Sequence, residues 1–101
     1  MADVYKVATV DGLKPGQSMI VDVDGTDIAL FNVNGEFFAI TNICAHRGGS
    51  LAAGSVDNGV VTCPIHGWQF NIKDGSNAMI GPSVSCFETR VEDGNVYIVM
   101  G

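Results

Sequence analysis

Four residues of this chain are of the types that bind transition metals, and they lie in two short segments. The segments are Cys44-Ala45-His46 and Cys63-Pro64-Ile65-His66, separated by the sixteen residues 47–62. A mononuclear zinc site usually takes two Cys from one segment and two His from another, with roughly two to five residues between ligands. Here each segment offers one Cys and one His, and the spacing of Cys44 and His46 is tight for chelating one tetrahedral ion. This spacing suits a centre of two adjacent metals. Each segment then supplies one ligand to each metal.

A Rieske 2Fe-2S centre is such a case, because two Cys hold one iron and two His hold the other. Around the two pairs the chain also has Asn42-Ile43-Cys44, Arg47-Gly48-Gly49 and the continuation Gly67-Trp68. With these motifs the chain resembles the Rieske-type 2Fe-2S ferredoxins that are components of bacterial aromatic-ring-hydroxylating dioxygenase systems. The resemblance extends from roughly Ile28 to the C-terminus. A structural zinc site is the alternative for the same four residues.

The resemblance implies one 2Fe-2S cluster of the Rieske type. In the family pattern Cys44 and Cys63 would bind the inner ferric iron, and His46 and His66 would bind the outer, reducible iron. Imidazoles are neutral whereas thiolates are anionic, so the electron would enter and leave at the histidine end. The residues implied to surround the cluster are Arg47, Gly48, Gly49, Ile65, Gly67, Trp68 and Pro82.

Several of these surrounding residues have a second, structural interpretation. Gly48 and Gly49 would let backbone N–H groups approach the bridging sulfides, or they form a plain tight turn. Pro82 would belong to the proline-containing loop that Rieske proteins place against the cluster, although a surface turn would look identical in sequence. Trp68 would pack at a docking interface or, as we favour, lie partly buried in the core.

High-potential Rieske proteins of respiratory chains carry an extra Cys in each ligand loop, and the two form a disulfide beside the cluster. This chain has Gly49 and Ile65 at those positions, and it has Trp68 where those proteins place a Ser hydroxyl near a sulfide. Fewer hydrogen bonds to sulfur stabilise the reduced state less. We therefore expect a reduction potential near the low end of the Rieske range of roughly −150 to +300 mV.

The function implied by the resemblance is one-electron transfer. An NAD(P)H-dependent flavin reductase would donate the electron and a terminal Rieske oxygenase would accept it. Oxygenase subunits need further His and carboxylate ligands for a mononuclear iron, but both His of this chain already lie in the motif, so we expect no catalysis by this chain alone. Two alternatives stay open: the small subunit of an assimilatory NAD(P)H nitrite reductase, and a zinc-containing interaction module without redox activity.

The composition describes a small acidic protein of 101 residues, with 47% hydrophobic residues and a formal net charge of −6. An acidic surface disfavours nucleic acid and anionic membranes as partners. The charge would steer the protein towards basic docking patches, or it would simply keep the protein soluble. No apolar run approaches the roughly 20 residues of a membrane helix, and the first residues are unlike a signal sequence. We therefore expect a cytoplasmic protein that needs no more than a monomer.

Alternating apolar residues and turn dipeptides predict an all-β fold. Helical periodicity is nearly absent, apart from one helical turn expected at 50–54. Asp24-Gly25, Asn34-Gly35 and Asp93-Gly94 are strong signals for hairpin turns. The expected strands cover residues 4–8, 17–23, 26–33, 36–40, 60–62, 69–72, 83–91 and 95–100, with turn-rich connections at 11–16 and 57–59.

We expect these strands to form a Rieske-like antiparallel β-sandwich as a single domain over residues 1–101. A small cluster-binding subdomain at about residues 41–80 would carry both ligand loops, the first with Cys44 and His46 and the second with Cys63 and His66. The remainder would form a basal β-domain. The third cysteine, Cys86, has no disulfide partner, as expected in a reducing compartment. Because it lies in a strand-like run, we expect Cys86 to be a buried small hydrophobe, with a reactive thiol as the alternative.

Overall fold

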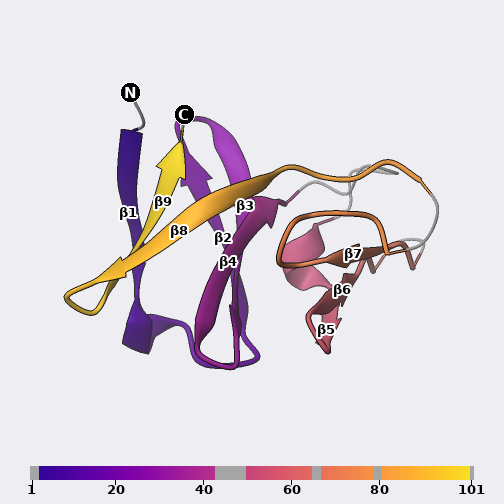
Figure 1. Cartoon of the computed structure of the whole chain (residues 1–101), viewed down its shortest axis with the longest axis horizontal. Coiled ribbons are helices and arrows are strands. Elements are labelled where there is room, and N and C mark those ends of the chain that lie inside the picture. The colour runs from indigo at the N-terminus through magenta and orange to yellow at the C-terminus, as the bar shows by residue number, and fades with distance from the viewer. Residues whose placement is uncertain (1–2, 43–49, 65–66, 79–80, 101) are drawn as a thin grey trace.

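The structure is a computed structural model and describes residues 3–42, 50–64, 67–78 and 81–100 (Figure 1). Within these ranges the regular structure is almost entirely β, which confirms the all-β prediction. The strands are β1 (Asp3–Thr9), β2 (Ser18–Val23), β3 (Thr26–Val33), β4 (Glu36–Thr41), β5 (Ser55–Asp57), β6 (Val60–Thr62), β7 (Gln69–Asn71), β8 (Cys86–Glu92) and β9 (Asn95–Met100). Two short 3-10 helices, η1 (Val10–Gly12) and η2 (Leu51–Ala53), lie between strands. None of the described helices is long and apolar enough to cross a bilayer.

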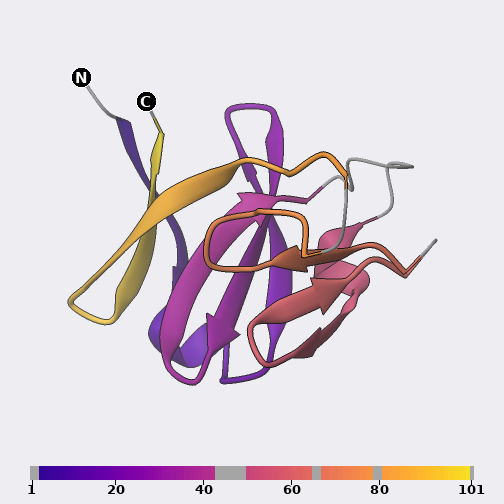
Figure 2. The same ribbon diagram turned by 45° about the vertical axis from the view of Figure 1, so that its right-hand side comes forward.

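The strands form two antiparallel sheets that lie side by side (Figures 1 and 2). The larger sheet has six strands in the order β1-β9-β8-β4-β3-β2, and the smaller has three in the order β5-β6-β7. Strand β1 pairs with β9 along its length, so the described ends of the chain lie close together at one end of the molecule. The smaller sheet is built from the residues between the two ligand loops and those that follow the second loop.

Four hairpin turns share one backbone geometry, in which both central residues have positive φ. Type I′ turns require this conformation, and their twist matches that of the strands they join. Gly adopts positive φ without strain, and Asp and Asn adopt it more readily than most residues with a side chain. The turns are Asp24-Gly25, Asn34-Gly35, Asn58-Gly59 and Asp93-Gly94, all at positions where the sequence predicts turns.

Strand β3, next to the edge strand β2, is buried on both faces and contributes to two hydrophobic cores. Ile28 and Leu30 face the core of the larger sheet, whereas Ala29 and Phe31 face a second core shared with the smaller sheet. This division follows from the alternation of side chains along a strand. The second core consists of Ala29, Phe31, Ile40, Leu51, Val61, Cys63, Phe70 and Ile72. It packs the smaller sheet against the larger one.

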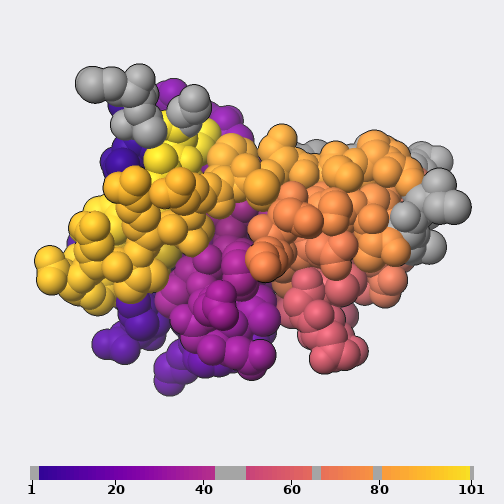
Figure 3. All heavy atoms as spheres, in the orientation of Figure 1, coloured from indigo at the N-terminus to yellow at the C-terminus, as the bar shows by residue number. Residues whose placement is uncertain are grey.

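The segment 81–85 crosses from the smaller sheet to the start of β8 (Figures 1 and 3). Val84 N donates to the carbonyl of Gly75 (2.9 Å), and the carbonyl of Ser85 accepts from Thr41 N (2.9 Å). These bonds go to a loop and to a strand end, so they do not form a ladder. The strand predicted over 83–91 therefore begins only at Cys86, and it pairs with β4 at just two positions before it continues along β9.

The remaining differences from the predicted elements are small. Gln17 is not the first residue of β2, because its side-chain Oε1 accepts from Lys14 N (2.9 Å) and closes a turn. Strand β7 ends at Asn71, because Gly75 N donates to the carbonyl of Asn71 (2.8 Å) and closes a turn. Strand β5 was not predicted, and η1 lies in and next to the connection expected to be a turn. The helical turn expected at 50–54 is confirmed by η2.

Candidate metal centre

One of the four predicted ligands, Cys63, is among the residues that the structure describes. Outside these residues lie Cys44, His46 and His66, together with the surrounding candidates Arg47, Gly48, Gly49 and Ile65. Within the described part of the chain, accordingly, there is no group of three or more His, Cys, Asp or Glu that could hold a metal. The site is therefore defined by Cys63 and by the residues at the bases of the two ligand loops.

Cys63 follows directly after β6 and is buried, with 2% of its surface exposed. Its N–H donates to the carbonyl of Trp68 (2.7 Å), and its own carbonyl accepts from Gly67 N (3.0 Å). These two bonds close the second ligand loop at its base. Gly67 has φ +75°, a conformation that Gly adopts without strain, and this explains why a Gly stands at the end of the loop.

The first ligand loop is also closed by hydrogen bonds at its base. The carbonyl of Asn42 accepts from Leu51 N (2.7 Å), and its side-chain Oδ1 accepts from Ala52 N (2.9 Å) and from Ser50 Oγ (3.0 Å). Leu51 is fully buried and belongs to the same core as Cys63. Figure 2 shows η2, which contains Leu51, beside the smaller sheet. One hydrophobic core therefore anchors the bases of both ligand loops.

Trp68 is half-buried and packs against the second core, which confirms the core interpretation. Its ring centroid lies 6.5 Å from that of Phe70, with an interplanar angle of 42°. The backbone of Gly81 also lies against the indole, because a Cβ built on Gly81 would be 3.1 Å from the ring. Pro82 is exposed, and its carbonyl accepts from Asn77 Nδ2 (3.0 Å). The loop that contains Gly81 and Pro82, called the third loop below, therefore rests on Trp68, which follows the second ligand loop.

The prediction that Cys86 is buried is wrong, because this thiol is exposed. Cys86 is the first residue of β8, where half-buried and exposed side chains alternate. Phe87 and Thr89 are half-buried, whereas Cys86, Glu88 and Arg90 are exposed. Strand alternation therefore places Cys86 on the outer face with two charged residues.

A hydrogen-bonded group of polar residues orders the turn after β7. The hydroxyl and the backbone N–H of Ser76 donate to Asp74 Oδ1 at 2.7 and 2.9 Å. These two bonds stabilise the carboxylate and hold the pKa of Asp74 below its usual value. The Ser76 hydroxyl also accepts from Asn71 Nδ2 (2.9 Å), so the turn is tied to the last residue of β7.

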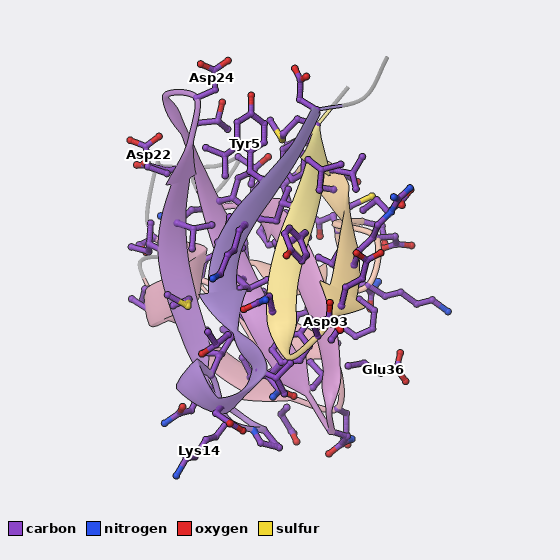
Figure 4. All side chains as sticks on the ribbon, turned by 90° about the vertical axis from the view of Figure 1, so that its left-hand side faces the viewer. Tyr5, Lys14, Asp22, Asp24, Glu36 and Asp93 are labelled. Carbon is purple, nitrogen blue, oxygen red and sulfur yellow. The ribbon has the colours of Figure 1, made fainter. Side chains whose placement is uncertain are left out.

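Acidic residues of the larger sheet are spread along it. Figure 4 shows the side chains of Asp22 and Asp24 near one end of the sheet, and those of Glu36 and Asp93 further towards the other. All four residues are exposed.

Sequence reasoning did not identify two side chains that hold the loops, those of Asn42 and Asn77. Asn is usually exposed, so hydropathy gives no sign that Asn42 is buried. The available signal was position: Asn42 lies two residues before Cys44 in the motif Asn-x-Cys. Asn77 had no comparable signal, because its partners Pro82 and Ser83 lie five and six residues further along the chain.

The residues present fit a mixed Cys and His iron–sulfur centre. Cys63 is a buried thiol in a loop closed by backbone hydrogen bonds, and a second closed loop carries a further Cys and His in its sequence. A buried thiolate needs a positive partner such as a metal ion, and two thiolates with two imidazoles are the donor set of a Rieske cluster. The all-β fold and the described residues at the bases of the two loops fit a small protein that holds a metal cluster.

The chain belongs to the Rieske [2Fe-2S] domain family, because the model of that family matches residues 3–96. Its cofactor is accordingly one 2Fe-2S cluster of the Rieske type. This result confirms the family and the cofactor that the sequence motifs predict.

Relatives of similar length support the same assignment. The 3-phenylpropionate/cinnamic acid dioxygenase ferredoxin subunit of Photorhabdus laumondii is 38% identical over 98 residues, which cover 93% of this chain and 91% of the relative. The ferredoxin in a complex of reduced oxygenase and oxidized ferredoxin of carbazole 1,9a-dioxygenase has a TM-score of 0.88 and 31% identity, covering 94% of this chain and 91% of its own. A structure from Mycobacterium tuberculosis is provisionally assigned as the small subunit of an NADH-dependent nitrite reductase. It has a TM-score of 0.92 and 26% identity, and the match covers 100% of this chain and 97% of that one.

Proposed function

We propose that this protein is a one-electron carrier, the ferredoxin component of a multicomponent Rieske oxygenase system. The observation that carries the proposal is Cys63, a buried thiol at the base of a closed loop in a chain of the Rieske family. The ferredoxin subunit from Photorhabdus laumondii supports it, because that relative matches over more than nine-tenths of both chains.

We assign the cluster ligands as the family pattern implies: Cys44 and Cys63 on the inner iron, and His46 and His66 on the outer one. When bound, the cluster supplies a centre that takes up and releases one electron. Cys63 would hold its iron from within the second core, where water is excluded, and the closed loop would keep the thiolate in place. The residues that we propose to surround the cluster, as the family resemblance implies, are Arg47, Gly48, Gly49, Ile65, Gly67, Trp68 and Pro82.

A terminal oxygenase is the electron acceptor in this proposal, and an NAD(P)H-dependent flavin reductase is the donor. The complex of oxygenase and ferredoxin in the carbazole system supports the first assignment. The protein would perform no chemistry of its own on a substrate and would act as a cytoplasmic monomer. The proposed organisation is one domain over residues 1–101, in which a cluster-binding subdomain at about 41–80 includes the smaller sheet.

A second candidate is the small subunit of an assimilatory nitrite reductase. The structure from Mycobacterium tuberculosis supports it through its TM-score of 0.92. In that role the chain would be a permanent part of an enzyme. Isolation of the tagged protein from its own host separates the two, since a permanent subunit stays bound to a large enzyme subunit through gel filtration and a shuttle does not.

The proposed function is tested by spectroscopy of the purified protein. We expect a brown oxidised protein, and after reduction with dithionite a rhombic electron paramagnetic resonance signal whose mean g value is below that of all-cysteine 2Fe-2S ferredoxins. Cys63→Ser should abolish the native signal, whereas Cys86→Ser, which changes an exposed thiol, should leave it unchanged. A colourless protein that contains zinc would refute electron transfer and favour the zinc module.

A further inference from the structure

Asn42 and Asn32 are the buried polar residues in the described part of the chain, each with 3% of its surface exposed. Burying an amide costs free energy unless its polar atoms are hydrogen-bonded. Asn42 meets this requirement through Oδ1, which accepts from Ala52 N at 2.9 Å and from Ser50 Oγ at 3.0 Å. Both donors lie beyond the segment 43–49, which includes Cys44 and His46. A single buried side chain therefore joins the two ends of the first ligand loop.

The bond to Ala52 replaces the usual cap of η2. Ser50 is the N-cap residue of this helix, and a Ser in that position normally accepts from the second or third N–H of the helix. Here the Ser50 hydroxyl makes no such bond and donates to Asn42 instead. Asn42 Oδ1 takes the N–H of Ala52, the second residue of η2. The helix is thus capped by a residue from the far side of the ligand loop.

Backbone bonds extend this arrangement to the sheet. Asn42 N donates to the carbonyl of Asp27 (3.0 Å), which fixes Asn42 beside β3. The carbonyl of Asn42 accepts from Leu51 N (2.7 Å), and Leu51 is fully buried in the core that contains Cys63. Ser18 Oγ on β2 donates to the carbonyl of Ala52 (2.7 Å). Both ends of the loop are therefore held to the same sheet.

We propose that Asn42 is a positioning residue for the cluster, whose side chain fixes the loop that carries Cys44 and His46. The inference rests on the proposed function, since it requires that these two residues bind the cluster. Replacing residues that orient metal ligands typically lowers metal affinity or activity by roughly 10–100-fold. Asn42 thereby determines how firmly the cluster is held, in addition to stabilising the fold.

Asn32 offers a matched control for the purely structural role. It is equally buried, and its side chain also joins distant segments: Nδ2 donates to the carbonyl of Leu13 (2.7 Å), and Oδ1 accepts from Gly35 N (2.8 Å). These contacts lie at the turn between β3 and β4, whereas Asn42 follows the opposite end of β4. Asn32→Ala therefore removes a buried amide without touching either ligand loop.

The test compares the intact cluster-containing protein with Asn42→Ala and Asn32→Ala. The rate at which cluster absorbance is lost in excess EDTA is measured beside the midpoint of urea unfolding by circular dichroism. We expect both variants to unfold at lower urea, but only Asn42→Ala to lose its cluster faster, by roughly 10–100-fold.

Each outcome decides the proposal. Equal rates of cluster loss in Asn42→Ala and Asn32→Ala would overturn it while leaving the proposed function intact. Wild-type protein that never holds a 2Fe-2S cluster would overturn both. If Asn42→Ala fails to fold, Ser50→Ala serves in its place, because it removes one of the two side-chain bonds and leaves that of Ala52. It should lose its cluster faster than Asn32→Ala, and a rate equal to that of Asn32→Ala would overturn the proposal.

Discussion

The indole of Trp68 lies against the backbone of Gly81, so closely that a Cβ on Gly81 would be 3.1 Å from the ring. Trp68 follows the second ligand loop, and Gly81 precedes Pro82 in the third loop. The hydrogen bond from Asn77 Nδ2 to the carbonyl of Pro82 holds the third loop in this position. The absence of a side chain at residue 81 thus lets two loops meet that are distant in sequence.

Gly81→Ala should push the two loops apart. Its Cβ would also lie 3.0 Å from Asn77 Nδ2, and φ at this position is +149°, which favours Gly. We expect a loss of about 1–3 kcal/mol in the free energy of unfolding. Trp68 is the single Trp of the chain, so its fluorescence emission reports the displacement directly. Unchanged emission would show that the third loop accommodates a methyl group without moving Trp68.

Gly75→Ala should destabilise the protein more than the replacement of an unobstructed turn glycine by Ala does. Its Cβ would overlap the carbonyl oxygen of Val84, and φ is +76°. We expect a loss of about 2–4 kcal/mol, from the strained backbone and from the displaced segment 81–85. Gly94→Ala is the matched control, because φ is +77° with no atom within 4 Å, and it should cost about 1 kcal/mol. Urea unfolding checks both values, and equal losses would contradict the overlap.

Alkylation should distinguish the exposed cysteine from the buried one. Cys86 is exposed and Cys63 is buried. Iodoacetamide should therefore modify the peptide that contains Cys86 in the folded protein, while Cys63 reacts only after unfolding. Peptide mass spectrometry measures both. Because Cys86→Ser removes a residue outside the ligand motif, it should abolish this labelling and leave the absorption spectrum unaltered. Labelling of Cys63 in the folded state would contradict its burial.

The hydrogen bonds that Ser76 donates to Asp74 should make the stability of the protein depend on pH in the acid range. The pKa of Asp74 is lower in the folded protein than its usual value of 3.8, so folding favours the charged carboxylate. This stabilisation is complete above the unfolded value and is lost as the pH falls through the lower folded value. Asp74→Asn should therefore lower the urea midpoint at neutral pH, and the difference from wild type should shrink below pH 3.8. A difference between Asp74→Asn and wild type that stays constant from neutral pH to below pH 3.8 would contradict this stabilisation.

The ligand motif and the hairpins were accessible from sequence because both depend on short-range chemistry. Asn34-Gly35 and Asp93-Gly94 specify positive φ at two successive residues, and this conformation alone selects the type I′ hairpin. The Cys and His pairs are likewise defined by residue type and spacing over a few positions, and the family match confirms the cofactor that they imply. The apolar run from Ile28 to Phe31 lies in a predicted strand. The sequence of this run does not show that the two faces of the strand pack into different hydrophobic cores.

Tertiary structure decided the features that depend on partners far along the chain. Strand propensity says nothing about which face of β8 meets a neighbour, so Cys86 was predicted to be buried although it is exposed. The sequence presents Gly75 as an ordinary turn residue, whereas in the structure Val84 lies against its backbone and leaves no room for a Cβ. In the sequence Asn42 is a polar residue two positions before Cys44. It can be buried because its amide oxygen accepts a hydrogen bond from Ala52 N, ten residues along the chain, and so caps η2. Sequence alone determined the chemistry of the site and its local turns, whereas only the folded chain brought together the groups that hold its loops.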